Sequence, residues 1–351
     1  MTIQQLLHYT IENKASDLHL VVGAVPVVRI DGDLIPVVGE VILNEAVIEP
    51  LIIGTMSPET RDIFKVNKEV DYSFALEGSS RFRVNAYYQK SSPAASFRLI
   101  PSEIPAIDLL GLPAVCHQVT QLKQGFVLVT GPTGHGKSTT LAAIIEEINK
   151  TRPAHIVTIE DPIEYVYSSA KSIVSQREVH NDTHSWDIAL RSILREDPDV
   201  VLIGEMRDLE TITAALTIAE TGHLVFATLH TNSAAQTIDR VVDVFPENQQ
   251  PQIRMQLSGV LEVVISQRLI PKIGGGRTVA TEIMKGSSAV RTAVREGRTH
   301  MLDNIIMTSG EYGMQTLESS LGELVKRQII TMETAQNFAV RPADLTRFIK
   351  L

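Results

Sequence analysis

Gly131-Pro132-Thr133-Gly134-His135-Gly136-Lys137-Ser138-Thr139 is the stretch of this sequence that decides its fold. It matches the spacing G-x-x-x-x-G-K-[ST], and its flanks are the ones that this pattern needs. The apolar run 126–129 before it predicts a strand, and the apolar residues at 141, 144, 145 and 148 follow a helical spacing. A strand, a glycine-rich loop and a helix together form a cradle for phosphate groups, built from backbone N–H groups and a helix N-terminus.

We therefore expect residues 131–139 to contact ATP, with Mg²⁺ beside its phosphates. The Lys137 amine would reach the β- and γ-phosphates, and the Ser138 hydroxyl would hold the Mg²⁺ ion. His135 would face the phosphates only through its backbone. The alternative is a glycine-rich turn that merely contains Lys-Ser, but it leaves the flanking strand and helix unexplained.

Composition limits the class of protein. The chain has 351 residues, a net charge of −9 and 44% hydrophobic residues, which together predict two globular domains and no general attraction to nucleic acid. The single cysteine, Cys116, excludes an intramolecular disulfide framework and a multi-cysteine zinc site, and it fits a reducing compartment. Residues 1–11 lack the layout of a signal peptide, and no apolar run is long enough to cross a membrane. We expect a cytoplasmic protein that meets the membrane only through a partner.

The order of predicted elements divides the chain into four parts. Residues 1–100 mix helices with alternating strands and predict an α+β domain. Residues 101–114 contain three prolines and predict an interdomain linker. Residues 115–285 alternate strands and helices, which predicts an α/β fold with a RecA-like core, and residues 286–351 predict a helical C-terminal region. Beyond residue 230 we expect mostly helix, with Gly274–Gly276 at a hairpin or loop tip.

The second signal is an acidic residue after the apolar run 200–203. This run predicts a buried parallel strand. Glu205 comes directly after its end, beside Gly204, and Arg195 and Arg207 flank the run. An acid at the carboxyl edge of such a strand can bind Mg²⁺ or polarise the attacking water of a nucleotide-hydrolysing site. The alternative is a solvated carboxylate at a strand end.

Two more segments end strands at the same predicted edge. Glu160 and Glu164 lie just after the predicted strand 155–159, where they would support the metal or the water, or would only flank a helix N-terminus. His230 follows the predicted strand 224–228 and would contact the γ-phosphate or sense its loss. A lone histidine is also a common structural residue. The predicted metal site therefore consists of Ser138, Glu160 and Glu205.

These four segments together resemble the secretion ATPase superfamily of type II secretion and type IV pili, and within it the pilus retraction ATPases of twitching motility. Segments 15–20, 29–32 and 81–86 resemble the PAS-like N-terminal domain of that family. The chain lacks the long N-terminal extension and the four-cysteine zinc insertion of the extension and secretion members. Residues 289–298 resemble a motif of the retraction members, from which positions 290, 292, 293, 294 and 298 depart, and His135 stands where the family usually has serine.

The resemblance implies a homohexameric ring with ATP bound between subunits, in which hydrolysis changes the angle between two domains. It implies a pilus platform protein of the inner membrane as partner and a place at the inner face of that membrane. Arginines from a second domain or a neighbouring subunit would then assist the chemistry. The candidates are Arg83 and Arg98, with Arg81 beside them, and Arg195 and Arg207.

Other functions stay open at this point. A RecA-like nucleic-acid motor would need a basic channel, against which the acidic balance speaks. A non-catalytic nucleotide-binding scaffold would predict a missing lysine or acid, whereas Lys137, Ser138 and Glu205 are all present. A retraction-accessory paralogue or a secretion ATPase of the same superfamily would carry the same motifs.

Overall fold

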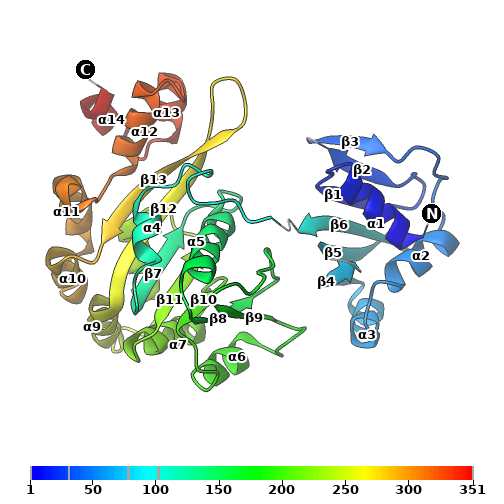
Figure 1. The fold of residues 1–351 in the computed structure, drawn as a ribbon, viewed down its shortest axis with the longest axis horizontal. Coiled ribbons are helices and arrows are strands. Elements are labelled where there is room, and N and C mark those ends of the chain that lie inside the picture. The colour runs from blue at the N-terminus through cyan, green and yellow to red at the C-terminus, as the bar shows by residue number, and fades with distance from the viewer. Residues whose placement is uncertain (1, 31, 77–79, 101–102, 350–351) are drawn as a thin grey trace. The chain divides into compact units, whose positions relative to one another are not determined.

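The computed structural model describes residues 2–30, 32–76, 80–100 and 103–349, and the chain divides into two compact units (Figure 1). The first unit comprises Met1–Glu103 together with Pro162–Val166, and the second comprises Ile104–Asp161 and Tyr167–Leu351. The boundary between 103 and 104 falls inside the predicted linker 101–114, of which 101 and 102 lie outside the described residues. The four-part division of the chain stays a prediction.

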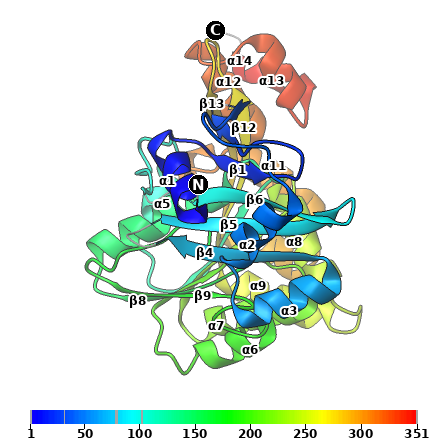
Figure 2. The same cartoon turned by 90° about the vertical axis from the view of Figure 1, so that its right-hand side faces the viewer.

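The first unit is an α+β domain around a 6-stranded sheet of order β3-β2-β1-β6-β5-β4, in which neighbouring strands are antiparallel. Three helices accompany the sheet (Figure 2). The helices are α1 (Ile3–Glu12), α2 (Glu45–Ile53) and α3 (Pro58–Asn67), and the strands are β1 (Asp17–Leu20), β2 (Val27–Ile30), β3 (Asp33–Pro36), β4 (Glu69–Leu76), β5 (Ser80–Gln89) and β6 (Ser92–Ile100).

One face of this sheet forms the core of the first unit. On β5, Phe82, Val84 and Ala86 are buried together with apolar side chains of α1, α2 and α3. Because successive side chains of a strand point to opposite faces, Arg81 and Arg83 lie on the other face. Arg83 is the cross-strand neighbour of Arg98 on β6. Two of the predicted arginines therefore share one face of one domain.

The second unit contains a 7-stranded sheet of order β13-β12-β7-β11-β10-β8-β9. All neighbouring strands are parallel except β12 and β13, which form an antiparallel pair at one edge of the sheet. The strands are β7 (Gly125–Thr130), β8 (His155–Glu160), β9 (Ile173–Glu178), β10 (Val200–Ile203), β11 (Leu224–Leu229), β12 (Leu261–Pro271) and β13 (Arg277–Lys285). The predicted RecA-like α/β core is confirmed.

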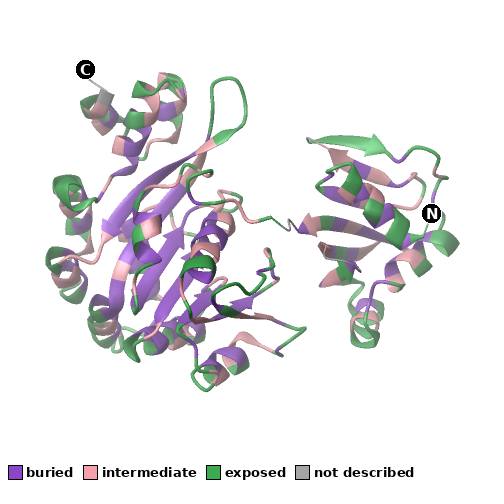
Figure 3. Cartoon of the chain, viewed as in Figure 1, coloured by how far each residue is buried: buried purple, intermediate pink, exposed green. Residues whose placement is uncertain are grey.

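Helices bury the central strands of this sheet completely. Every residue of β7, β10 and β11 is buried, as Figure 3 shows for the inner strands, so these strands are continuous apolar runs rather than alternating ones. The helices of this core are α4 (Val115–Val119), α5 (Lys137–Thr151), α6 (Trp186–Ile193), α7 (Leu209–Glu220), α8 (Ala234–Asp243) and α9 (Gln250–Val260). Cys116 is buried on α4, as its apolar neighbours predicted.

Beyond residue 230 the described residues are mostly helical, as expected, and residues 261–285 are the exception. Here β12 and β13 form a long antiparallel hairpin, with Gly274–Gly276 at the tip as predicted. The run Val263-Val264-Ile265 is β-branched, and pairing with β7 buries it.

The C-terminal region is helical, as predicted. It contains α10 (Ser288–Arg295), α11 (Leu302–Thr308), α12 (Leu317–Lys326), α13 (Met332–Phe338) and α14 (Pro342–Ile349), with short 3₁₀ turns at Thr299–Met301 and Gly310–Tyr312. Leu317, Leu321 and Leu345 of these helices form a small core with Ile270 and Ala280 of the hairpin. Across the described ranges, no helix combines the length and apolar character that crossing a membrane requires.

Candidate functional site

The candidate site lies at the carboxyl edge of the 7-stranded sheet. Strand β11 stands between β7 and β10, and β8 follows β10. The register aligns Leu229 with Thr130 and Ile203 with Ile159. The glycine-rich loop, His230, Glu205 and Glu160 therefore emerge from four adjacent strands at one edge, where parallel α/β sheets bind their ligands.

Three glycines give the loop its shape. Gly131, Gly134 and Gly136 have φ values of 143°, 78° and 82°, in the region that side-chain-bearing residues avoid. Gly131 is also crowded, because a Cβ atom there would lie 2.3 Å from the Gln267 carbonyl oxygen of β12. The first glycine is thus required by a close backbone approach as well as by its φ.

Strand β12 holds the tip of the loop through His135. The Leu269 amide donates a hydrogen bond to His135 Nδ1 at 3.1 Å, and Gln267 Nε2 donates to the His135 carbonyl oxygen at 2.7 Å. Burial lowers the pKa of His135, and the nearby positive charges of Arg268, Lys137 and Arg277 lower it further. The prediction that His135 faces the phosphates only through its backbone did not include this side-chain contact with β12.

Helix α5 begins directly after the loop, at Lys137. Its N-cap, Gly136, supplies no side-chain hydrogen bond, whereas α6, α7 and α8 of the same unit are capped by Ser185, Asp208 and Ser233. The first amides of an α-helix have no partner within the helix. The first turn of α5 therefore offers N–H groups and a positive dipole end to an anion.

Lys137 is buried beneath the loop. Its amine donates to the carbonyl oxygens of Gly131 and Pro132 at 2.9 and 3.1 Å, and it lies 3.4 Å from His230 Nδ1. Thr133 Oγ1 lies 3.2 Å from the same ring nitrogen. His230 is thereby brought to the loop, as its place at a strand end predicted.

Glu205 completes this network from β10. Its carboxylate lies 3.1 Å from His230 Nε2 and accepts a hydrogen bond from Arg207 Nη2 at 2.7 Å. Burial raises the pKa of Glu205, but the Arg207 hydrogen bond and the charges of His230 and Arg207 outweigh burial, and its pKa falls below the usual range. Glu205 is therefore a carboxylate at neutral pH, linked through one imidazole to the loop lysine.

The two other predicted acids differ from each other. Glu160 is buried at the end of β8, where its Oε1 accepts hydrogen bonds from Thr158 Oγ1 at 2.6 Å and Gln176 Nε2 at 3.2 Å. Glu164 is exposed in the segment Pro162–Val166, which belongs to the first unit. Roles for either in metal or water placement stay predictions.

The predicted arginines are dispersed. Arg98 Nε donates to Asp17 Oδ1 at 2.8 Å within the first unit, where Arg83 also lies. Arg195 is exposed in the turn before β10, at the amino end of that strand and away from the loop edge. Arg207 contacts the predicted acid Glu205 directly.

The residues at the loop fit an Mg²⁺ ion that is bound together with a nucleotide. Among the residues that the structure describes, no group of three or more His, Cys, Asp and Glu side chains is placed to hold a metal ion. Mg²⁺ is commonly held by few protein oxygens together with substrate phosphates and water. Ser138 lies in the first turn of α5 and carries a hydroxyl oxygen of this kind, and its role in holding Mg²⁺ stays a prediction.

Sequence reasoning missed the residues that support the site from β12 and β9. Gln267 and Leu269 contact His135 across more than 130 positions, and Gln176 contacts Glu160 across 16. No local pattern marks these three residues, because their role depends on which strands become neighbours of β7 and β8.

Known proteins share this architecture. A family model described as "Type II/IV secretion system protein" matches residues 1–338. The chain is 50% identical over 344 residues to the type IV pilus retraction ATPase PilT of Pseudomonas aeruginosa, covering 98% of this chain and 100% of that protein. It is 48% identical over 316 residues to a twitching motility protein of Neisseria gonorrhoeae, covering 90% of this chain and 84% of that protein.

A solved structure agrees with these relatives. The crystal structure of the pilus retraction motor PilT with bound ADP superposes with a TM-score of 0.93 at 47% identity, covering 99% of both chains. The likeness extends over both units and the C-terminal helices, so the predicted fold class is confirmed beyond the ATP-binding core.

Proposed function

Because the chain belongs to the type II/IV secretion system protein family, we propose that it is an ATP-hydrolysing motor of type IV pilus retraction that works through Glu205 and His230. Its 50% identity to a retraction ATPase over nearly the whole chain supports retraction as the motor's task. The ADP-bound relative supports nucleotide binding at the loop. The observation that carries the mechanism is the continuous contact from Glu205 through His230 to Lys137.

The loop holds the phosphates in this mechanism. The amides of the first turn of α5 donate to phosphate oxygens, and the Lys137 amine turns from the carbonyls of Gly131 and Pro132 to the same oxygens. Mg²⁺, when bound beside Ser138, neutralises charge on the β- and γ-phosphates. A charged Glu205 accepts a hydrogen bond from the attacking water and orients it toward the γ-phosphate.

His230 is placed to sense whether the γ-phosphate is present. The ring lies between Glu205 and Lys137 and touches Thr133 of the loop. A phosphate that draws Lys137 away changes the contact at His230 Nδ1, while Nε2 of the same ring stays beside Glu205. We propose that the arginines of the first unit, Arg83 and Arg98, complete the site in an assembled ring, with ATP between subunits.

The assembly around the motor is part of the same proposal. We propose a homohexamer that acts on a platform protein of the inner membrane, and a place at the inner face of that membrane through this partner. Changes of angle between the two units around the ring would turn the platform protein. The similarity to retraction ATPases supports this assembly.

Steady-state hydrolysis of ATP by the purified full chain tests the site. We expect Glu205→Gln to lower kcat by about 10²–10³-fold, the loss typical of removing one electrostatic contributor, while nucleotide still binds. Glu210→Gln removes an exposed carboxylate from the first turn of α7 and is the matched control, with activity unchanged. Full activity of Glu205→Gln would refute the assigned acid.

Two further measurements separate the remaining parts of the proposal. Titration of Mg²⁺ against hydrolysis, with Ser138→Ala beside the wild type, tests the metal, and we expect a higher Mg²⁺ requirement in the variant. Light scattering in the presence of nucleotide tests the ring. A monomer that hydrolyses ATP at full rate would refute the assembly and leave the site assignment standing.

A further inference from the structure

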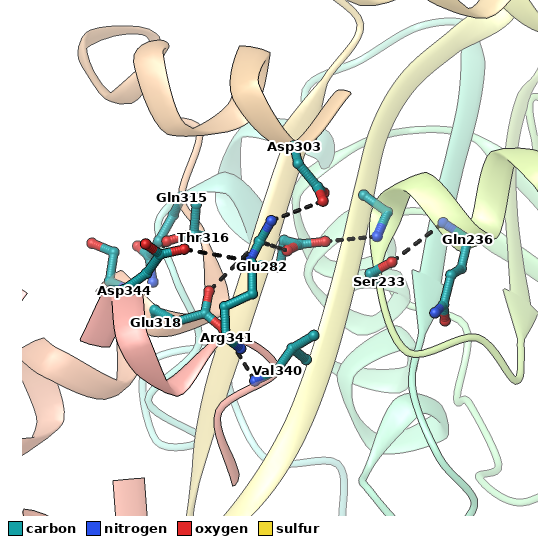
Figure 4. Close-up of polar contacts among 12 residues, drawn as sticks. Ser233, Gln236, Glu282, Asp303, Gln315, Thr316, Glu318, Val340, Arg341 and Asp344 are labelled. Carbon is teal, nitrogen blue, oxygen red and sulfur yellow. Dashed lines mark hydrogen bonds and ion pairs between the residues drawn. The ribbon is translucent and has the colours of Figure 1, made fainter. Parts of the chain in front are cut away.

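A buried carboxylate outside the nucleotide site anchors the helix that follows His230. Glu282 lies on β13 and is 3% exposed. Its Oε1 accepts a hydrogen bond at 2.7 Å from the amide of Ala234, the first residue of α8 (Figure 4). A carboxylate at a helix N-terminus satisfies an unpaired amide and complements the helix dipole.

The N-terminus of α8 lies close to both the His230 segment and the strand end that leads into the loop. Only three residues separate Ala234 from His230. Thr237 Oγ1 of α8 lies 2.7 Å from Thr231 Oγ1, directly after His230. The same hydroxyl lies 3.5 Å from Thr130 Oγ1, at the end of β7 where the loop begins. A shift of this helix end would therefore move the His230 segment against the loop.

On its other side, Glu282 faces Arg341 of the C-terminal region. Arg341 Nη2 lies 3.7 Å from Glu282 Oε2, and Arg341 Nη1 lies 2.8 Å from Asp303 Oδ2 (Figure 4). Glu318, which is 1% exposed, fixes the backbone here, because its Oε1 accepts the amides of Val340 and Arg341. Arg341 is thus a fixed cation between the C-terminal helices and β13.

The charges around Glu282 come from four elements. They are the N-terminus of α8, α11 with Asp303, α12 with Glu318, and α14 with Asp344 and with Arg341 directly before it. Arg341 Nη2 lies 3.6 Å from Glu318 Oε2, and Arg341 Nε lies 4.0 Å from Asp344 Oδ2. Burial raises the pKa of Glu282 to about 7, and Asp303 and Glu318 add to the rise, while the Ala234 amide and Arg341 oppose it. Acidic groups outnumber the single arginine here. Arg341 attracts Glu282 only while Glu282 carries its negative charge.

We propose that Glu282 is a positioning residue for ATP hydrolysis, which holds the N-terminus of α8, and through it the His230 segment, in register with the C-terminal helices by way of Arg341. This inference rests on the proposed function, since it concerns the histidine assigned to the γ-phosphate. Structural changes in the C-terminal helices would reach the nucleotide through two side chains, and nucleotide would act on those helices through the same pair.

The pH dependence of folding stability distinguishes a positioning role of Glu282 from simple stabilisation of the fold. A carboxyl whose pKa is raised by folding keeps its proton to higher pH than in the unfolded chain, so folding stability falls as pH rises through about 7. Above that pH the charged Glu282 costs stability while it pairs with Arg341. We expect Glu282→Gln, which retains an acceptor for the Ala234 amide, to be at least as stable as wild type at pH 8.

A double-mutant cycle on the full chain tests the inference. The variants are Glu282→Gln, Arg341→Gln and the two combined, and Arg327→Gln is the control because it removes an arginine from an exposed ion pair on α12. We expect each single variant to change kcat by about 2- to 30-fold, the range of couplings between distant residues, and the double variant to be no worse than either. The wild-type kcat should change near pH 7, and that change should vanish in Glu282→Gln.

Hydrogen exchange of the peptide 229–237 without nucleotide supplies a second readout. We expect faster exchange in Glu282→Gln and Arg341→Gln, and wild-type exchange in Arg327→Gln. Additive effects in the cycle, an unchanged pH response of Glu282→Gln, or wild-type exchange in the peptide would each overturn the inference. A wild type without ATPase activity would reject the proposed function instead, while the exchange result would still decide the role of Glu282.

Discussion

Replacement of His135 by alanine is expected to weaken nucleotide binding, although no side chain proposed to contact the phosphates is changed. The substitution leaves the Leu269 amide without its acceptor at 3.1 Å. An unpaired buried donor costs about 1–3 kcal/mol, and the half-buried Leu269 belongs at the lower end of that range. If the cost falls on the binding-competent loop, about 1 kcal/mol raises Kd for ATP roughly fivefold.

His135→Asn is the matched control, because its side-chain oxygen can take the place of Nδ1. Titration of a fluorescent ATP analogue at pH 8 measures Kd for the three proteins, with hydrolysis giving KM and kcat. We expect His135→Ala to raise Kd and KM with kcat little changed, and His135→Asn to stay near wild type. Equal affinity of His135→Ala and wild type, or equal weakening in both variants, would refute the reasoning.

Acid supplies an independent check on the same contact. Burial and the charges of Arg268, Lys137 and Arg277 lower the pKa of His135, so the contact is present at neutral pH and is lost only in acid, at a lower pH than an ordinary histidine would need. Protonated Nδ1 cannot accept the Leu269 amide. Wild-type affinity for ATP should therefore fall in acid, whereas His135→Asn should show a flatter response. The effect belongs to KM and is distinct from the kcat effect expected of Glu282.

Two other substitutions or reactions test the fold around the site. Gly131→Ala should abolish nucleotide binding and lower the free energy of unfolding by roughly 1–3 kcal/mol, because its Cβ would lie 2.3 Å from the Gln267 oxygen. At Gly134 a Cβ atom would meet nothing within 4 Å, so Gly134→Ala should lose less stability in denaturation assays and less affinity in binding assays. Burial raises the pKa of Cys116 to about 12, so a maleimide should label it only upon unfolding. Rapid labelling of the native protein would contradict its buried place on α4.

Much of the site could be predicted from the sequence because strand ends carry it. Glu205 and His230 each follow a continuous apolar run, and such runs in an α/β pattern become parallel strands whose carboxyl ends meet at one edge. The loop residues are recognisable for the same reason, since glycine spacing and a following helix are local properties. Their meeting within hydrogen-bond distance confirms the predicted edge.

The supporting shell could not be predicted in this way. Gln267 and Leu269 act on His135 because β12 continues past the end of β7, and that register depends on packing across the sheet. The hairpin tip at Gly274–Gly276 could be predicted, but the full length of β12 could not, since a β-branched run among helices has no local feature that reveals its partner strand. Glu282 and Arg341 likewise lie 59 positions apart in sequence and meet only after β13 and the C-terminal helices have packed.

Helix α5 has no side-chain hydrogen bond at its N-cap, unlike α6, α7 and α8. A bound phosphate would do for this helix what a serine or an aspartate does for α6 and α7. The nucleotide is then a structural component of the helix as well as a substrate, and its concentration enters the folding equilibrium directly. The melting temperature of this protein should rise with ATP even in a variant that never hydrolyses it, because the bound phosphate caps a helix that has no capping side chain of its own.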